Sequence, residues 1–285
     1  MTSVRKLLAR YAIQPRNKWG QSFLEDRNII RRIVALADPA GDETVVEIGA
    51  GLGLMTEELA KRAGRVIALE IDPRLVAVLQ DRFIGQERVQ ILQIDVLKYD
   101  FSVARPGGRI KVVGNIPYTI SSPILFRLLD FRRSISLMIL MFQKELANRI
   151  TAPPGTKDYG IPSVLVARYS KATCELTVPP TCFYPVPDVV SSVLRISVRP
   201  EPNLTDGAMF TKIVRAAFAQ RRKTLWNNLR HTGIPEEMVG RMFAASGIER
   251  TRRAETLSVE EFSLITAAWI GSGADKFLDK SSCIW

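Results

Sequence analysis

Four short apolar runs in the first half of the chain each lead to a residue that can contact a ligand. The runs cover 45–48, 65–70, 89–95 and 110–115, and they lead to Gly49, Glu70, Asp95 and Asn115. These positions are 21, 25 and 20 residues apart, about one strand and one helix with their loops. The recurrence predicts strands alternating with helices in an open parallel α/β sheet. In such a sheet, ligands bind at the carboxyl ends of the strands.

Three more strands are expected over 134–142, 172–178 and 190–198, which brings the sheet to seven strands. We expect the order 3-2-1-4-5 for the first five strands, so that strand one lies beside strand four. The last strand is expected to be antiparallel, at or near an edge. Four prolines within 179–187 predict a rigid extended loop between the last two strands.

The sequence pattern divides the chain into two expected domains. Residues 1–200 form the α/β domain, and after a linker at 199–203 the pattern becomes helical only. Residues 201–285 are therefore expected to form a small all-helical domain with a flexible tail. Only the two ends, residues 1–18 and the tail after Trp269, have compositions that favour disorder.

The formal net charge of +11 favours a polyanionic partner such as nucleic acid, although a basic surface without a partner would look the same. The excess is concentrated in two regions. Residues 1–32 hold eight Lys and Arg against two acids, and residues 206–253 hold ten against four. Within the second region, Arg221, Arg222 and Lys223 form a run suited to phosphate contacts, or to a solvated helix face.

Other features narrow the setting of the protein. Three cysteines without a CxxC pair indicate neither a disulfide framework nor a zinc site, and a reducing cytoplasm fits them. No apolar run is long enough to cross a membrane, and the amino terminus lacks the apolar core of a secretory signal. A short basic start is also compatible with an organellar targeting segment. The only histidine, His231, is expected at a helix end, so the chemistry should need no histidine base.

Residues at the first three strand ends suit a cofactor that contains a nucleoside. Gly49 and Gly51 let the backbone approach a ligand closely, because no Cβ intervenes. Glu70 can accept two hydrogen bonds from the hydroxyls of a ribose, and Asp95 can accept one from an adenine amine. The glycine turn alone could be purely structural. With Glu70 added, a nicotinamide cofactor would still fit equally well.

The turn formed by Asn115, Ile116, Pro117 and Tyr118 indicates the type of reaction. The exocyclic amine of adenine is a poor nucleophile, because its lone pair is delocalised into the ring. The Asn115 side-chain oxygen and the Ile116 carbonyl can accept its two hydrogens and favour a tetrahedral nitrogen. Pro117 fixes the backbone of the turn, and Tyr118 offers a ring on which an unstacked base can rest. We therefore expect an S-adenosylmethionine-dependent methyltransferase acting on adenine, with no metal.

Several motifs in order resemble the ribosomal RNA small-subunit adenine dimethyltransferases over about residues 14–270. They are residues 18–24 (KWGQSFL), 46–53 (VEIGAGLG), 114–118 (GNIPY), 143–145 (QKE), 179–187 (PPTCFYPVP), 219–225 (AQRRKTL) and 253–258 (RAETLS). The resemblance implies a Rossmann-like seven-stranded methyltransferase sheet. It implies cofactor contacts from Ser22, Leu24, Gly49, Glu70, Asp95 and Asn115, and a Phe183 ring that stacks on the target base opposite Tyr118.

The resemblance also implies a substrate. Two adjacent adenosines in the 3′-terminal hairpin loop of 16S-type RNA would each receive two methyl groups, within an immature small ribosomal subunit. The protein is expected to act as a monomer in the cytoplasm, away from any membrane. The chain departs from the family pattern at Ser22, Asp188 and Trp226, where Asn, Lys and Arg are usual. Three alternative hypotheses remain open. The chain could be a resistance methyltransferase of the large subunit, a binding protein that has lost activity, or a nicotinamide oxidoreductase.

Overall fold

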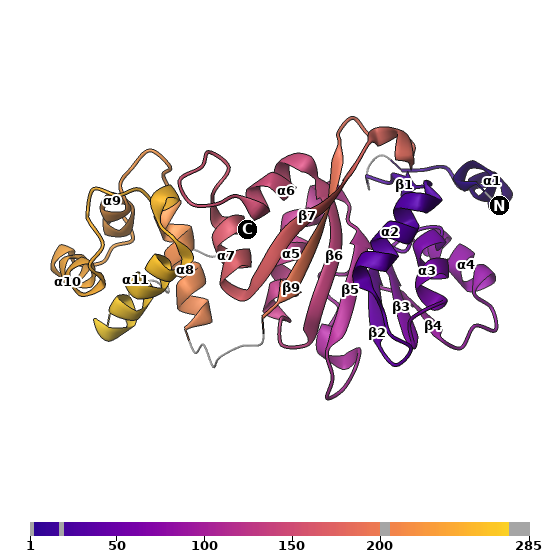
Figure 1. The fold of residues 1–285 in the computed structure, drawn as a ribbon, viewed down its shortest axis with the longest axis horizontal. Coiled ribbons are helices and arrows are strands. Elements are labelled where there is room, and N and C mark those ends of the chain that lie inside the picture. The colour runs from indigo at the N-terminus through magenta and orange to yellow at the C-terminus, as the bar shows by residue number, and fades with distance from the viewer. Residues whose placement is uncertain (1–2, 17–19, 200–205, 274–285) are drawn as a thin grey trace. The chain divides into compact units, whose positions relative to one another are not determined.

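A computed structural model describes residues 3–16, 20–199 and 206–273, and these fall into two compact units (Figure 1). The first unit comprises Met1–Ala147 and Ser170–Pro200, and the second comprises Asn148–Tyr169 and Glu201–Trp285. One division between the units falls near residue 200. Residues 148–169 pack with the helical unit, although the sequence pattern assigned them to the α/β domain. The predicted linker core and the tail beyond residue 273 lie outside the described residues.

The first unit contains a seven-stranded sheet with the order β4-β3-β2-β5-β6-β9-β7. Its strands are β2 (Thr44–Ile48), β3 (Arg65–Glu70), β4 (Val89–Gln93), β5 (Ile110–Asn115), β6 (Ile135–Gln143), β7 (Ser170–Val178) and β9 (Ser191–Val198). The first five pair in parallel, in the predicted order. Strand β9 is antiparallel to both β6 and β7. The last strand is thus antiparallel and second from the edge, as predicted, and β7 is the edge strand.

Helices α2 (Arg27–Ala37), α3 (Leu54–Ala60) and α4 (Pro73–Arg82) cover one face of this sheet (Figure 1). Buried side chains from all three helices join one core cluster with Val45, Val66 and Val113, which alternate with residues pointing to the other face. Asp26 and Asp72 cap α2 and α4 by accepting hydrogen bonds from backbone N–H groups of the first turn. Two further helices of the chain follow β5 and β6, namely α5 (Ser121–Asp130) and α6 (Lys144–Thr151).

The amino-terminal segment is ordered where the sequence composition favoured disorder. Helix α1 (Val4–Arg10) begins at Ser3, whose hydroxyl accepts a hydrogen bond from the Lys6 N–H. Val4, Leu7 and Leu8 are buried in the core cluster, which explains why a basic segment still folds. Strand β1 (Phe23–Leu24) then pairs antiparallel with β8 (Phe183–Tyr184) in the proline loop. The expectation of disorder is wrong for the described part of residues 1–18.

The second unit is a small helical body with its own aromatic core. Its helices include α7 (Ile161–Tyr169), α8 (Gly207–Ala217), α9 (Leu225–Arg230), α10 (Glu236–Ser246) and α11 (Val259–Gly271). The rings of Phe218 and Phe262 stack at 5.9 Å, and Trp269 is fully buried. The family departure Trp226 packs its ring against Phe243 and lies beneath the Arg250 guanidinium. Among the described residues, no helix is long and apolar enough to span a membrane.

Candidate active site

A cavity at the carboxyl ends of β2, β3 and β5 brings together almost all of the predicted site residues. Its lining includes ten of them, namely Ser22, Leu24, Gly49, Gly51, Glu70, Asp95, Asn115, Ile116, Pro117 and Tyr118. The parallel order of the strands explains this, because it places the ends of neighbouring strands at one edge of the sheet. Among the predicted catalytic and cofactor-binding residues, Phe183 is the one that does not line the cavity.

The glycine turn wraps closely around its neighbours. Gly49, Gly51 and Gly53 have φ of 70°, 57° and 76°, a backbone conformation that residues other than glycine rarely adopt. A Cβ at Gly51 would lie 3.2 Å from the Phe23 ring. The N–H groups of Gly49 and Ala50 both donate to the Leu69 carbonyl. Glycine is therefore required for the turn itself as well as for ligand access.

Glu70 is a buried acceptor that the backbone already holds in place. Its carboxylate accepts hydrogen bonds from the N–H groups of Gly51, Ile71 and Asp72 at 2.8–2.9 Å. Burial raises the pKa of Glu70, against the effect of these three bonds. A carboxylate offers about four acceptor positions, so about one remains for a ligand. If both hydrogen bonds predicted from ribose hydroxyls form, one Glu70 carboxylate oxygen must accept from a ribose hydroxyl and a backbone N–H at the same position.

Glu47 lies on β2, lines the same cavity and keeps its proton at neutral pH. The side chain is 1 % exposed, and the Thr56 hydroxyl donates to it at 2.5 Å. Burial raises the pKa of Glu47 to about 8, the Thr56 bond opposes this shift, and the charge of Glu70 adds to it. A protonated carboxyl can donate as well as accept a hydrogen bond. Glu47 therefore contributes a protonated carboxyl to the cavity lining rather than a negative charge.

Asp95 follows β4 and keeps one oxygen available. Its Oδ1 atom accepts from the Leu97 N–H at 3.0 Å, which fixes the side chain in a turn. No described residue donates to its Oδ2 atom. Asp95 lines the cavity, so this oxygen can accept a hydrogen bond from a ligand amine.

The side-chain amide of Asn115 is oriented by a contact that the sequence did not reveal. Its Nδ2 atom donates to the Ser22 carbonyl at 3.1 Å. This bond fixes which way the amide points and leaves Oδ1 as the acceptor. Among the described residues, no turn or loop hydrogen bond ends on the Ile116 carbonyl. The two acceptors predicted for a substrate amine are therefore both available.

Tyr118 begins the short 3₁₀ turn η3 (Tyr118–Ile120) and is tied to the sheet through its hydroxyl. That hydroxyl shares a hydrogen bond of 2.5 Å with the Ser191 Oγ atom at the start of β9. Burial raises the pKa of Tyr118, against the effect of this bond. The ring is thus held at one end while it still lines the cavity.

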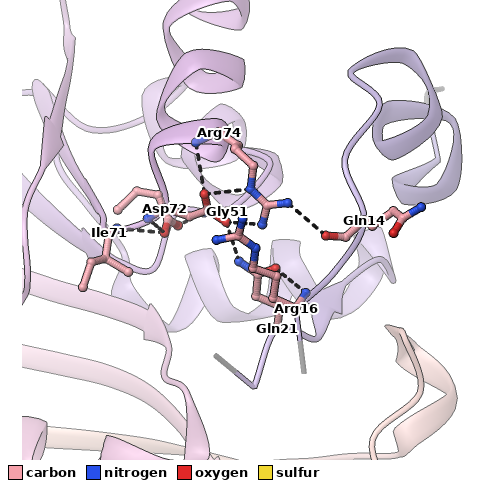
Figure 2. Close-up of polar contacts among 8 residues, drawn as sticks. Gln14, Arg16, Gln21, Gly51, Ile71, Asp72 and Arg74 are labelled. Atoms are coloured by element: carbon pink, nitrogen blue, oxygen red, sulfur yellow. Dashed lines mark hydrogen bonds and ion pairs between the residues drawn. The ribbon is translucent and has the colours of Figure 1, made fainter. Parts of the chain in front are cut away.

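The amino-terminal segment is fastened beside the cavity through Asp72 (Figure 2). Gln21 donates to the Asp72 carboxylate at 3.0 Å, and Arg74 forms an ion pair with the same group. Arg74 also donates to the Gln14 carbonyl at 3.2 Å. Burial acts to raise the pKa of Asp72, but the bonds from Arg74 and Gln21 outweigh it and hold that pKa below its usual value. Sequence reasoning missed Asp72, whose visible signal was only that of a helix cap before Pro73.

Ser22 makes two contacts with protein groups. Its carbonyl accepts from Asn115, and its hydroxyl donates to the Pro185 carbonyl at 2.8 Å. The hydroxyl that was expected to face the cofactor therefore joins the amino-terminal segment to the proline loop. Its oxygen can still accept a bond from a ligand.

Phe183 occupies a different place from the one predicted. It is 1 % exposed and belongs to the core cluster of the first unit, where β8 pairs with β1. In this conformation the ring is buried and does not line the cavity, so its stacking on a target base opposite Tyr118 stays a prediction. The burial indicates the role of a core aromatic residue beneath the proline loop. Stacking on a base would require the ring to leave the core.

The predicted RNA-binding run lies in the helical unit. Arg221, Arg222 and Lys223 are exposed in the turn between α8 and α9, rather than on a helix face. The Arg221 guanidinium donates to the Lys157 carbonyl. Among the described residues, no group of three or more potential ligands could hold a metal ion, and Cys174 and Cys182 are free thiols.

Residues 12–269 match the family model described as ribosomal RNA adenine dimethylase. The chain belongs to this family. It is 46 % identical over 273 residues to the ribosomal RNA small subunit methyltransferase A of Syntrophus aciditrophicus, with 93 % of this chain and 98 % of the relative covered. The protein of the same name from Bacillus mycoides is 41 % identical over 277 residues, covering 93 % and 95 %.

Solved structures agree with the family assignment. A dimethyladenosine transferase from Plasmodium falciparum has a TM-score of 0.77 and 24 % identity, covering 88 % of this chain and 98 % of that one, and supports the fold. The 23S rRNA methyltransferase ErmE has a TM-score of 0.66 and 28 % identity, covering 86 % and 98 %. The chain is therefore an rRNA adenine dimethyltransferase with a methyltransferase-type α/β sheet.

Proposed function

We propose that this protein dimethylates the N6 amines of two adjacent adenosines in the 3′-terminal hairpin loop of 16S-type rRNA, using S-adenosylmethionine. The proposal takes the protein to act as a monomer on the precursor of the small subunit in the cytoplasm. Its choice of subunit rests on identities of 46 % and 41 % to proteins named as small-subunit methyltransferases, matched over nearly their whole length. The oriented Asn115 amide is the observation that carries the proposed chemistry.

The cavity fits the proposed cofactor. Glu70 and Asp95 each retain acceptor capacity for hydroxyl and amine groups, and Gly49 and Gly51 leave the backbone open to a ligand. Leu24, Met55 and Leu75 add apolar lining, which suits a nucleoside base. When bound, S-adenosylmethionine supplies a methyl group that is already activated on a sulfonium.

The residues of this chain position the substrate amine. The Asn115 Oδ1 atom and the Ile116 carbonyl accept its two N–H groups, which favours a tetrahedral nitrogen with an available lone pair. Pro117, with φ of −55°, fixes the turn before the substrate arrives. Tyr118, anchored through Ser191, supplies a surface for the flipped base. Positioning of this kind can supply much of the catalysis in a transfer reaction.

Neither glutamate of the cavity is suited to act as a general base, and the carboxylate of Asp95 is proposed to hold the cofactor amine. Glu47 already holds its proton at neutral pH, and Glu70 is occupied by three backbone N–H groups. The single histidine of the chain, His231, belongs to the helical unit. After attack, the substrate nitrogen is cationic and strongly acidic, so solvent can take its proton.

The remaining contacts of the proposal concern the RNA. Arg221, Arg222 and Lys223 are exposed cations that can contact phosphates, giving affinity and orientation without reading sequence. Phe183 is proposed to stack on the target base after a local rearrangement of the proline loop. The strand pair β1–β8 that buries it is only two residues long on each side, which supports such a rearrangement.

Labelling of isolated ribosomal subunits tests the proposal. Purified protein is incubated with labelled S-adenosylmethionine and with either small or large subunits that lack the modification, and methylated adenosines are then mapped by mass. We expect two dimethylated neighbours in the small subunit. Labelling of the large subunit alone would instead support the activity named for the 28 % identical ErmE.

Asn115 variants test the mechanism. Asn115→Ala removes the acceptor, and we expect kcat to fall about a hundredfold or more, as when one preorganised polar contact to a reacting group is lost. Asn115→Asp keeps an acceptor but loses the N–H that faces the Ser22 carbonyl, so we expect it to lose activity as well. Wild-type rates from both variants would remove Asn115 from the mechanism.

A further inference from the structure

The basic side chains of the amino-terminal region have no role in the site described so far. Residues 1–32 hold eight Lys and Arg residues, and none of these eight lines the cofactor cavity. Three of them, Arg10, Arg27 and Arg31, line a second cavity of the first unit together with Lys61 and Arg82. These residues come from α1, α2 and α4 and from the end of α3. The cavity volume of about 360 Å³ is several times the volume of one water molecule.

Positive charge exceeds negative charge around this second cavity. Five cations line it against two carboxylates, Glu57 and Glu58. Glu57 is shared by three cations, at 2.9 Å from Arg82, 3.4 Å from Arg27 and 3.9 Å from Lys61. Lys61 also contacts Glu58 at 2.8 Å. Even when Asp81, 3.9 Å from Arg10, is included, five cations face three acids.

Two of the guanidinium groups are held rigidly within this charge cluster. Arg82 is 16 % exposed, and besides Glu57 it donates to the Leu52 carbonyl. Burial lowers the pKa of Arg82, so its charge is poorly hydrated. Arg27 is 20 % exposed beside the same carboxylate. An anion that enters would therefore meet donors that are already oriented and that water solvates incompletely.

Arg31 is exposed, as are Arg10 and Lys61, but those two form ion pairs with carboxylates, so Arg31 is the cation chosen for substitution. It donates to the Asn28 Oδ1 atom at 3.4 Å, and its charge helps to lower the pKa of Glu58. Arg31 has a natural control in the next residue of α2, Arg32. Both are exposed and carry the same charge, but only Arg31 lines the cavity.

We propose that this second cavity binds a backbone phosphate of the RNA substrate. Guanidinium groups match phosphate oxygens geometrically, and a contact of this type orients an RNA without reading its sequence. The inference rests on the proposed function, because it takes RNA as the ligand. It adds a contact in the catalytic unit to the RNA-binding run proposed in the helical unit.

Charge reversal at the two neighbouring arginines tests the inference. Arg31→Glu and Arg32→Glu change the net charge equally, so a diffuse electrostatic attraction predicts equal losses of RNA affinity. A phosphate site predicts that Arg31→Glu weakens binding to the small-subunit RNA about threefold to tenfold, with the salt slope reduced by about one, while Arg32→Glu changes little. Thermal midpoints equal to that of the wild type, for both variants, show that the fold is intact.

Three outcomes would count against the inference. Equal losses for the two variants would indicate a diffuse field. Tight binding of inorganic phosphate by the wild type, with RNA affinity unchanged in Arg31→Glu, would indicate a site for a free anion instead. Failure of the proposed function is distinguishable, because wild-type protein would then leave small subunits unlabelled whatever the variants do.

Discussion

Glu47 gives the protein a pH dependence of stability that can be calculated from its burial. The ordinary pKa of this carboxyl is 4.5, and in the folded chain it is raised to about 8. Between these values the folded state keeps a proton that the unfolded state has released. Stability therefore falls as pH rises through this window, by about 1.4 kcal/mol per pH unit. Over this window of about 3.5 pH units, the loss of unfolding free energy approaches 5 kcal/mol. Below pH 4.5 the carboxyl is protonated in both states, so no stability is lost there.

The substitution Glu47→Gln isolates this effect, because glutamine keeps the shape of the protonated side chain and cannot ionise. Urea unfolding of both proteins at pH 6 and pH 9 gives the free energies to compare. Between these pH values we expect the wild type to lose about 3 kcal/mol more stability than the variant. Glu87→Gln, an exposed control, should follow the wild type. Parallel curves for wild type and Glu47→Gln would show that Glu47 is ionised in the fold, and the reasoning would fail.

Four other substitutions, one of them a control, give specific expectations. Gly53→Ala should lower stability by about 2–4 kcal/mol, because a Cβ there would lie 2.7 Å from the Phe83 ring at a φ of 76°. Gly85→Ala has the same φ and open space, and should lose about 1 kcal/mol; equal shifts in thermal midpoint would contradict the packing argument. Tyr118→Phe should lose about 1 kcal/mol with the Ser191 bond yet retain methyl transfer, and an inactive variant would assign the hydroxyl a chemical role. Phe183→Leu should keep the fold within about 1.5 kcal/mol, so a fall in its kcat would reveal stacking and an unchanged kcat would exclude it.

The sheet and the cavity were predictable because their signals are local and repeated. Gly49, Glu70 and Asn115 each stand at the end of a β-branched run, and parallel pairing places such ends at one edge. The pattern also predicted the antiparallel β9. These features need only the period of the chain and the usual order of strands.

Features that depend on backbone contacts between distant segments were not predictable. The Ser22 carbonyl that orients Asn115 is a backbone atom, and any residue at position 22 would present it. The burial of Phe183 depends on the pairing of β1 with β8, two strands too short to leave a pattern. The arginines and lysine of helix α1 give it a composition typical of disorder, so it was not predicted. Its folding depends instead on three apolar residues that are buried.

The division of the chain into units affects the order in which its segments can fold during synthesis. Residues 148–169 belong to the helical unit, yet the ribosome makes them before β7, β9 and most of their helical partners. During synthesis these residues must wait until α8 and α11 emerge, while β7 and β9 complete the sheet in between. A cut at residue 200 would separate them from that unit permanently. The protein should therefore tolerate a fused partner at its carboxyl terminus better than expression as two fragments divided there.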